Sequence, residues 1–102
     1  EANWDVSVDD KETLPSEMIL LTAYPNPFNP ATTIRFSVET HGYVSLQIYD
    51  VAGRLVETLL NGKLNPREYE VIWNASELPS GVYFYRLEAG EVSRTRKLLL
   101  LK

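Results

Sequence analysis

Apolar and polar side chains alternate along several short stretches of this chain. Within residues 33–39, for example, Ile34, Phe36 and Val38 are separated by polar residues. Alternate side chains of a β-strand point to opposite faces, so this pattern is typical of strands with one buried and one solvent-facing side. No stretch shows the period of about 3.6 residues that an amphipathic helix requires. The hydrophobic pattern therefore predicts a protein built from strands.

Seven segments are expected to be strands, at residues 18–23, 33–39, 43–50, 54–60, 68–73, 82–88 and 92–101. Several are separated by short turns that contain glycine, which adopts the positive φ of tight hairpins. Such turns join antiparallel strands, whereas parallel strands need long crossover segments. The chain has no cysteine. We therefore predict an all-β fold, a seven-stranded antiparallel immunoglobulin-like β-sandwich with no disulfide.

Residues 1–17 differ from the rest of the chain in composition. They contain six acidic side chains and one lysine, few apolar residues and no sustained period. Segments of this kind bury too little apolar surface to fold, so we expect an acidic linker or tail at 1–17 and the β-sandwich domain at 18–102. Trp4, Val6 and Val8 alternate with polar residues, and a short edge strand there is the alternative interpretation.

The composition excludes several classes of protein. The 102 residues fit one domain, and 44% apolar with 24% charged residues is typical of a globular fold. A net charge of −4 argues against a nucleic-acid partner, because phosphate groups attract basic surfaces. No apolar run approaches the roughly 20 residues of a membrane helix, and no signal-peptide pattern opens the chain. We expect no nucleic-acid partner and no membrane-spanning segment.

Residues suited to enzyme or metal chemistry are sparse. His41 is the only histidine, and it lies beside Gly42 in an expected turn. A catalytic base needs an orienting partner and a pocket, and the carboxylates fall on expected turns or solvent-facing positions. There is no His and Cys cluster of the kind that holds zinc. We predict a protein that is not an enzyme and has no catalytic residue, no metal and no cofactor.

A proline-rich segment separates the first two expected strands. After Tyr24 it consists of Pro25, Asn26, Pro27, Phe28, Asn29 and Pro30. Proline fixes φ, has no N–H and restricts the residue before it to extended conformations. The sequence therefore predicts a stiff, extended connector that belongs to neither a helix nor a central strand.

Two other segments are candidates for recognition. Residues 82–88 are apolar on both faces, which indicates either an incompletely covered face or a central strand covered by loops. The last segment concentrates positive charge at Arg94, Arg96 and Lys97, followed by Leu98, Leu99, Leu100, Leu101 and Lys102. That run is interpreted either as a final strand with charged residues that prevent aggregation, or as a surface that a partner reads.

Five blocks of the sequence follow one another in a recognisable order. The connector leads into residues 32–36, and after it come residues 48–54 with Gly53 and Arg54, the pair Trp73-Asn74, residues 78–83 with Pro79, Gly81 and Tyr83, and the closing residues 96–102. In this order they resemble the type A C-terminal sorting domain of the type IX secretion system, which is related to the immunoglobulin-like domain of flagellar hook-capping proteins. The resemblance covers about residues 22–102. One departure is Arg67, near which the family usually has glycine.

The resemblance implies a C-terminal secretion signal that directs an exported cargo protein through the type IX outer-membrane translocon and is then cleaved for surface attachment or release. The implied partners are the outer-membrane secretion machinery, a sortase-like peptidase and a cargo domain on the N-terminal side. The implied route runs via the periplasm to the cell surface or extracellular space of a Gram-negative bacterium. A signal peptide is then expected at the start of a longer precursor.

The resemblance implies that the folded domain is the address read by the translocon and that the residues nearest the C-terminal end matter most. The matching positions are Arg96, Lys97, Leu98, Leu99, Leu100, Leu101 and Lys102, and together with the neighbouring Arg94 they are the candidates for translocon recognition. A terminal strand offers backbone groups that a receptor captures by strand addition. Our hypothesis is that the basic side chains steer the receptor and the leucines anchor it.

Two other functions are compatible with the sequence. One is a noncatalytic carbohydrate-binding module appended to an extracellular enzyme, with Trp4, Tyr69, Trp73 or Tyr83 as a stacking platform. The other is a structural immunoglobulin-like spacer. Alternation of Tyr69, Val71 and Trp73 favours a core position for these side chains over an exposed platform.

Overall fold

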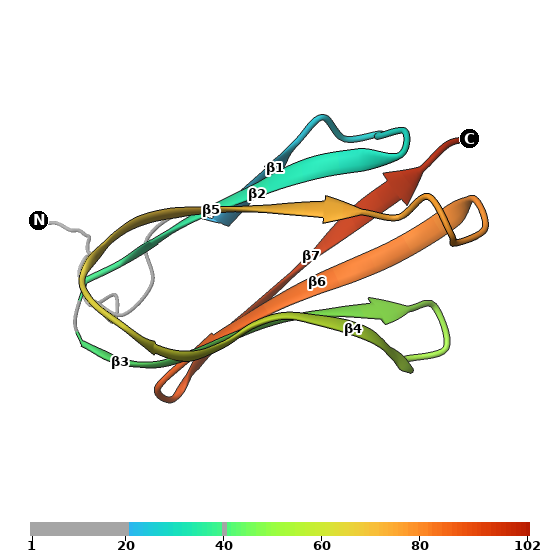
Figure 1. The fold of residues 1–102 in the computed structure, drawn as a ribbon. Helices are drawn as coiled ribbons and strands as arrows, with labels where there is room; N and C mark the ends of the chain where they lie inside the picture. The colour runs from blue at the N-terminus through green and yellow to red at the C-terminus, as the bar shows by residue number, and fades with distance from the viewer. Residues whose placement is uncertain (1–20, 40) are drawn as a thin grey trace, which may run out of the picture.

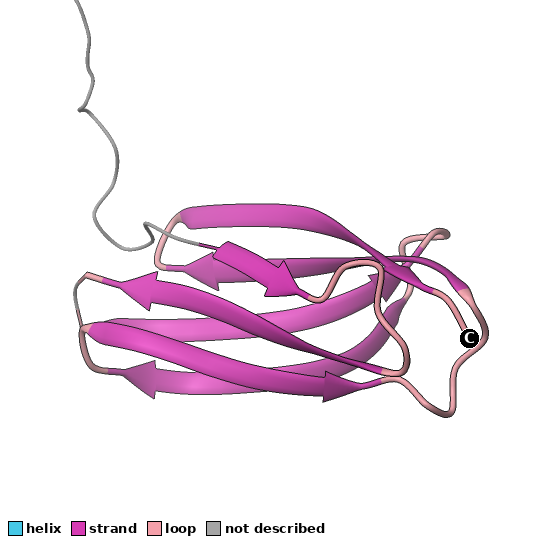
Figure 2. Cartoon of the chain, turned by 90° about the horizontal axis from the view of Figure 1, so that it is seen from above, coloured by secondary structure: helices cyan, strands magenta, loops and turns pink. Residues whose placement is uncertain are grey.

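The computed structural model describes residues 21–39 and 41–102. This part of the chain consists of strands joined by turns, as Figures 1 and 2 show. The strands are β1 (Leu21–Tyr24), β2 (Ala31–Val38), β3 (Gly42–Asp50), β4 (Leu55–Leu64), β5 (Arg67–Asn74), β6 (Gly81–Ala89) and β7 (Val92–Leu100). The described residues contain no helix long and apolar enough to cross a membrane. The predicted all-β class is confirmed.

The strands form two antiparallel sheets that pack face to face. The smaller sheet has the order β1-β2-β5 and the larger has the order β4-β3-β6-β7. This arrangement confirms the predicted seven-stranded immunoglobulin-like sandwich. The strands β1 and β5 are the edges of one sheet, and β4 and β7 are the edges of the other. The acidic segment 1–17, the alternative strand around Trp4, and the start of the first expected strand lie outside the described residues.

The alternating apolar positions form the core. Ile34, Phe36 and Val38 of β2 are buried, and so are the alternate side chains of β3 and β6 that face the interior. Each such side chain stabilises the fold by about 1.5–3 kcal/mol through the apolar surface it removes from water. Trp73, near the end of β5, is buried, and its ring is 5.5 Å from that of Phe28 and 5.7 Å from that of Tyr83. Packing of apolar and aromatic side chains, without any disulfide, therefore holds the two sheets together.

Strand β4 is longer and less regular than its pattern predicted. The pairing of β3 with β4 changes register between Leu46 and Gln47 and again between Ile48 and Tyr49. The shifts leave Leu59 and Val56 without a direct partner on β3, and both side chains pack against the core. An extra residue of this kind bends and twists a strand. The β4 edge of the larger sheet is consequently irregular.

The sequence predicted a stiff, extended connector, whereas in the structure the proline-rich segment is bent. It bends on both sides of Phe28 and carries that residue back into the sandwich. The Phe28 side chain is only 2% exposed and packs on Trp73. In Figure 1 the connector lies at the same end of the sandwich as the end of β7 and the turn between β5 and β6. The connector therefore contributes Phe28 to the core, while residues 25–27 and 29 are exposed.

Candidate functional site

The final strand β7 is an edge strand in which basic residues are followed by leucines. Leu98 and Leu100 lie opposite Tyr83 and Gly81 of β6, and both side chains are fully buried. Leu99 points to the other face and is half-buried, while Leu101 beyond the strand is 51% exposed. Two of the four leucines that we expected to anchor a receptor therefore belong to the protein's own core.

The basic side chains of β7 are exposed on both faces of the strand. Arg94 and Arg96 lie opposite Leu87 and Tyr85, on the face that turns toward the core, and Lys97 lies on the outer face. Burial raises the pKa of the Tyr85 phenol, and the charge of Arg96 acts in the opposite direction. Charged residues that point inward on an edge strand discourage unspecific pairing with other strands.

The connector closes the C-terminal half of the β7 edge. The Phe28 N–H donates to the carbonyl of Leu99 (2.9 Å), and the Leu101 N–H donates to the carbonyl of Phe28 (3.0 Å). The side-chain amide of Asn26 extends this pairing, because its Nδ2 donates to the carbonyl of Lys97 and its Oδ1 accepts from the Leu99 N–H, both at 3.0 Å. Four outward-facing backbone groups between Lys97 and Leu101 are thus satisfied within the domain.

Lys102 ties the end of the chain to the turn before β6. Its ammonium group donates to the carbonyls of Ser76 (2.8 Å) and Leu78 (2.7 Å), and its N–H donates to Ser80 Oγ (3.0 Å). In the same turn, the Tyr83 hydroxyl donates to the carbonyl of Pro79 at 2.7 Å. The block around Pro79 and the closing block therefore meet in space, which the sequence alone did not indicate.

A groove lies between the edges of the two sheets. It has a volume of about 580 Å³ and is lined by Thr22, Ala23, Asn26, Tyr85, Arg94, Thr95, Arg96 and Lys97. The side chains come from β1, the connector, β6 and β7. Three of the lining residues are cationic and none is acidic. The groove is therefore a positive surface on a chain of net negative charge.

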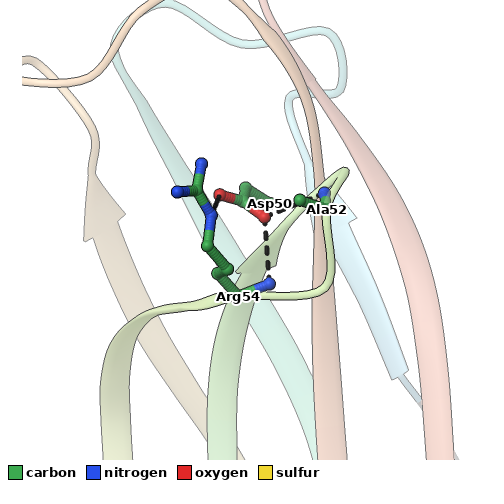
Figure 3. A network of polar contacts seen from close by, with 3 residues as sticks. All are labelled: Asp50, Ala52 and Arg54. Carbon is green, nitrogen blue, oxygen red and sulfur yellow. Dashed lines mark hydrogen bonds and ion pairs between the residues drawn. The ribbon is translucent and has the colours of Figure 1, made fainter.

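The turn between β3 and β4 is organised by one carboxylate, as Figure 3 shows. Asp50 Oδ1 accepts from the N–H groups of Ala52 (2.9 Å) and Arg54 (3.0 Å), and Oδ2 accepts from Arg54 Nε (3.0 Å). Gly53 has φ +82°, a left-handed conformation that L side chains rarely adopt. Asp50 therefore bonds to its own turn, and Gly53 and Arg54 belong to the same structural unit.

The Asp50 turn predicts a pH dependence. The backbone N–H of Arg54, helped by that of Ala52 and by the Arg54 charge, holds the pKa of Asp50 below its usual 3.8. A lowered pKa means that the ionised group stabilises the fold above pH about 4, and that this stabilisation is lost as the pH falls through the folded-state pKa. Asp50→Asn should therefore unfold at lower urea than the parent at neutral pH, with a difference that narrows below pH about 4. Urea titrations of both proteins across this range measure it, and a difference that stays constant would contradict it.

Two of the aromatic residues considered as a stacking platform for sugars lie inside the described sandwich. Trp73 and Tyr83 are buried, and the Trp73 Nε1–H donates to Glu57 Oε1 at 3.0 Å. Tyr69 is half-buried, stacks on Phe36 and lies beneath the guanidinium of Arg67. Trp4 lies outside the described residues. Stacking on a sugar needs an accessible ring face, so neither Trp73 nor Tyr83 serves the carbohydrate-binding alternative.

Other sites considered in the sequence have little structural support in the described ranges. No group of three or more His, Cys, Asp and Glu that could hold a metal ion occurs there. His41 is exposed in the turn before β3. On β6, Val82 and Phe84 are half-buried on the outer face of the sheet, while Ile72 on β5 is 70% exposed. The richest combination of charge, accessible backbone and concave shape is therefore at the edge of β7.

Comparisons with known proteins agree with this fold. The family model of the secretion system C-terminal sorting domain matches residues 22–101. The structure of dimeric latent PorU from Porphyromonas gingivalis is similar to 79% of this chain, with 22% identity and a TM-score of 0.64. That of PorZ, an essential surface component of the type IX secretion system of the same bacterium, is similar to 80% of it, with 26% identity and a TM-score of 0.56. The chain spans 9% of PorU and 11% of PorZ. No curated protein matches it.

Proposed function

Because the chain belongs to the family of type IX secretion system C-terminal sorting domains, we propose that residues 18–102 form a noncatalytic export address for a cargo domain on their N-terminal side. Residues 1–17 are then the acidic linker to that cargo. The activity of the whole exported protein resides in the cargo, and this domain determines where the cargo is delivered.

The coincidence of the family match with the folded unit carries this proposal. The matched range, residues 22–101, begins one residue into β1 and ends one residue after β7. The family's blocks also have structural roles here, because the connector, Trp73, the turn at Pro79 and the closing residues contact one another. The unit that a secretion apparatus reads is therefore the whole sandwich, including the end at which the connector, the turn at Pro79 and the closing residues meet.

The residues open to recognition are a subset of those inferred from the family. Arg94, Arg96 and Lys97 have exposed side chains, and Leu101 and Lys102 lie at the surface. Leu98 and Leu100 act indirectly, since their burial holds β7 in the sheet. We assign contact with the outer-membrane machinery to the exposed group and structural support to the buried pair.

The remaining steps follow from the same family membership. The cargo crosses the periplasm and reaches the cell surface or the extracellular space of a Gram-negative bacterium. A sortase-like peptidase then cleaves the precursor ahead of the connector, within the acidic linker, and the cargo is attached to the surface or released. Proteases act on extended, accessible backbone, and a polar linker of this composition meets that requirement.

Fusion to a reporter tests the export function. A reporter with its own signal peptide, followed by residues 18–102, should be found outside the cells of a host that has a type IX system. The same fusion in a host without that system should stay in the periplasm. Fractionation with an immunoblot for the reporter measures both. Retention of the folded fusion in the periplasm of the first host would refute the proposed function.

A further inference from the structure

The two halves of the β7 edge differ in whether their outward-facing backbone groups are paired. Within an antiparallel strand, successive residues direct their backbone groups to opposite sides. Leu99 directs both its N–H and its C=O to the connector, and so do the Leu101 N–H and the Lys97 carbonyl. The register with β6 is continuous from Val92 to Leu100. The same alternation therefore turns the N–H and C=O groups of Ser93 and Thr95 away from β6, together with the N–H of Lys97.

This outward side of residues 93–97 has no strand partner in the described ranges. Strand β7 is the last in the order β4-β3-β6-β7, and the connector reaches it only from Lys97 onward. An edge with unpaired backbone groups is a template for another strand. The opposite edge of the sheet, β4, is a poorer template because two register shifts disturb it. The open edge is thus short, regular and confined to one side of the domain.

The side chains around this open edge define the partner that fits it. Arg94 and Arg96 are two positions apart on one face, and Lys97 adds a third cation. The groove beside them contains no acidic lining residue. A strand laid along β7 presents every second side chain to the same face, so carboxylates at alternate positions would lie opposite the two arginines. A strand without such carboxylates would leave the positive charges of the two arginines without an opposite charge beside them.

We propose that residues 93–97 of β7 bind an extended acidic segment of a partner protein by strand addition. The proposal rests on the export function above and names the chemistry by which the address is read. Asn26 and Phe28 occupy the edge beyond Lys97, so the added strand is limited to the open half. The backbone supplies the pairing, and Arg94 and Arg96 supply the selectivity for acid.

A synthetic peptide and amide hydrogen exchange of the full chain test this directly. The probe is an acetylated and amidated heptapeptide of alternating glutamate and threonine. In the free chain the amides of Ser93 and Thr95 should exchange rapidly, and the probe should slow their exchange while leaving that of Leu99 unchanged. The same peptide with glutamine in place of glutamate should bind more weakly, and higher ionic strength should weaken the glutamate peptide further.

Two sets of variants separate the backbone contribution from the charge. Thr95→Pro removes an outward N–H without removing a bond to β6, a change that edge strands tolerate, and it should abolish binding, whereas Thr95→Val should retain it. Arg94→Gln and Arg96→Gln should each weaken binding about two- to fivefold. Lys63→Gln on β4 is the matched control, because it removes one exposed cation from the opposite edge and should leave binding unchanged.

Several results would overturn the inference. Slow exchange of Ser93 and Thr95 in the free chain would mean that the chain already covers this edge itself. Full binding by a folded Thr95→Pro variant would exclude strand addition, and equal binding of the glutamine peptide would exclude selection for acid. Failure of this inference can be told apart from failure of the export function. If the reporter is exported while the peptide does not bind, only this inference is wrong, and a bound peptide with a retained reporter refutes the export address.

Discussion

A chain that ends after Thr95 is expected not to fold. The cut removes Leu98 and Leu100, which are fully buried, and the backbone groups that pair with the connector. Truncating one buried leucine to alanine typically costs about 2–5 kcal/mol. Two such losses approach the total stability of about 5–15 kcal/mol for a domain. Far-UV circular dichroism and thermal melting should therefore show no cooperative unfolding.

A shorter truncation is the control for this experiment. A chain that ends at Leu100 keeps both core leucines, and it loses the exposed Leu101 side chain, the Leu101 N–H bond to Phe28 and the bonds of Lys102, so it should remain folded. If the longer truncation melted cooperatively near the parent's temperature, the assignment of Leu98 and Leu100 to the core would be wrong. If the longer truncation unfolds the domain, loss of export by that truncation would not show that the last segment is recognised. Point variants of exposed residues are therefore the proper test of recognition.

Replacement of Phe28 by alanine should lower the free energy of unfolding by about 3–5 kcal/mol. The side chain is 2% exposed, and its ring packs 5.5 Å from that of Trp73. The substitution leaves a cavity where the connector packs against Trp73. It also weakens the hold of the connector on Leu99 and Leu101, so the amides of both should exchange faster. Urea titration and amide exchange measure the two effects.

Tyr24→Ala provides the comparison for Phe28. Both residues are aromatic and lie four positions apart, but Tyr24 is 81% exposed. Its replacement should change the free energy of unfolding by no more than about 0.5 kcal/mol. An equal loss in both variants would show that the connector is stabilised by its general stiffness, and the specific insertion of Phe28 into the core would then be refuted.

Strand identity was predictable wherever one face of a strand is buried regularly. Ile34, Phe36 and Val38 occupy alternate positions, and β2 follows that pattern. On β4 the pattern was weaker, because two bulges bring Leu59 and Val56 toward the core out of strict alternation. The physical limit is that a periodic pattern describes regular strands, and register shifts break the period.

The candidate site was predictable in composition but not in geometry. The sequence placed positive charge before the leucines of the last segment, and it marked the connector as stiff. It held no signal that the connector would bend back onto β7, since contacts between distant segments leave no local period. In the same way, a run of four leucines does not distinguish the buried Leu98 from the exposed Leu101.

The contact between the connector and β7 also affects when the domain can form. The bonds of Asn26 to Lys97 and Leu99 join residues 71 and 73 positions apart. Closing so long a loop costs entropy before any contact forms, and contacts of this kind slow folding. During translation the connector leaves the ribosome long before its partner strand exists. A stalled nascent chain cannot close the sandwich, so only a chain synthesised through Leu100 can display the completed fold.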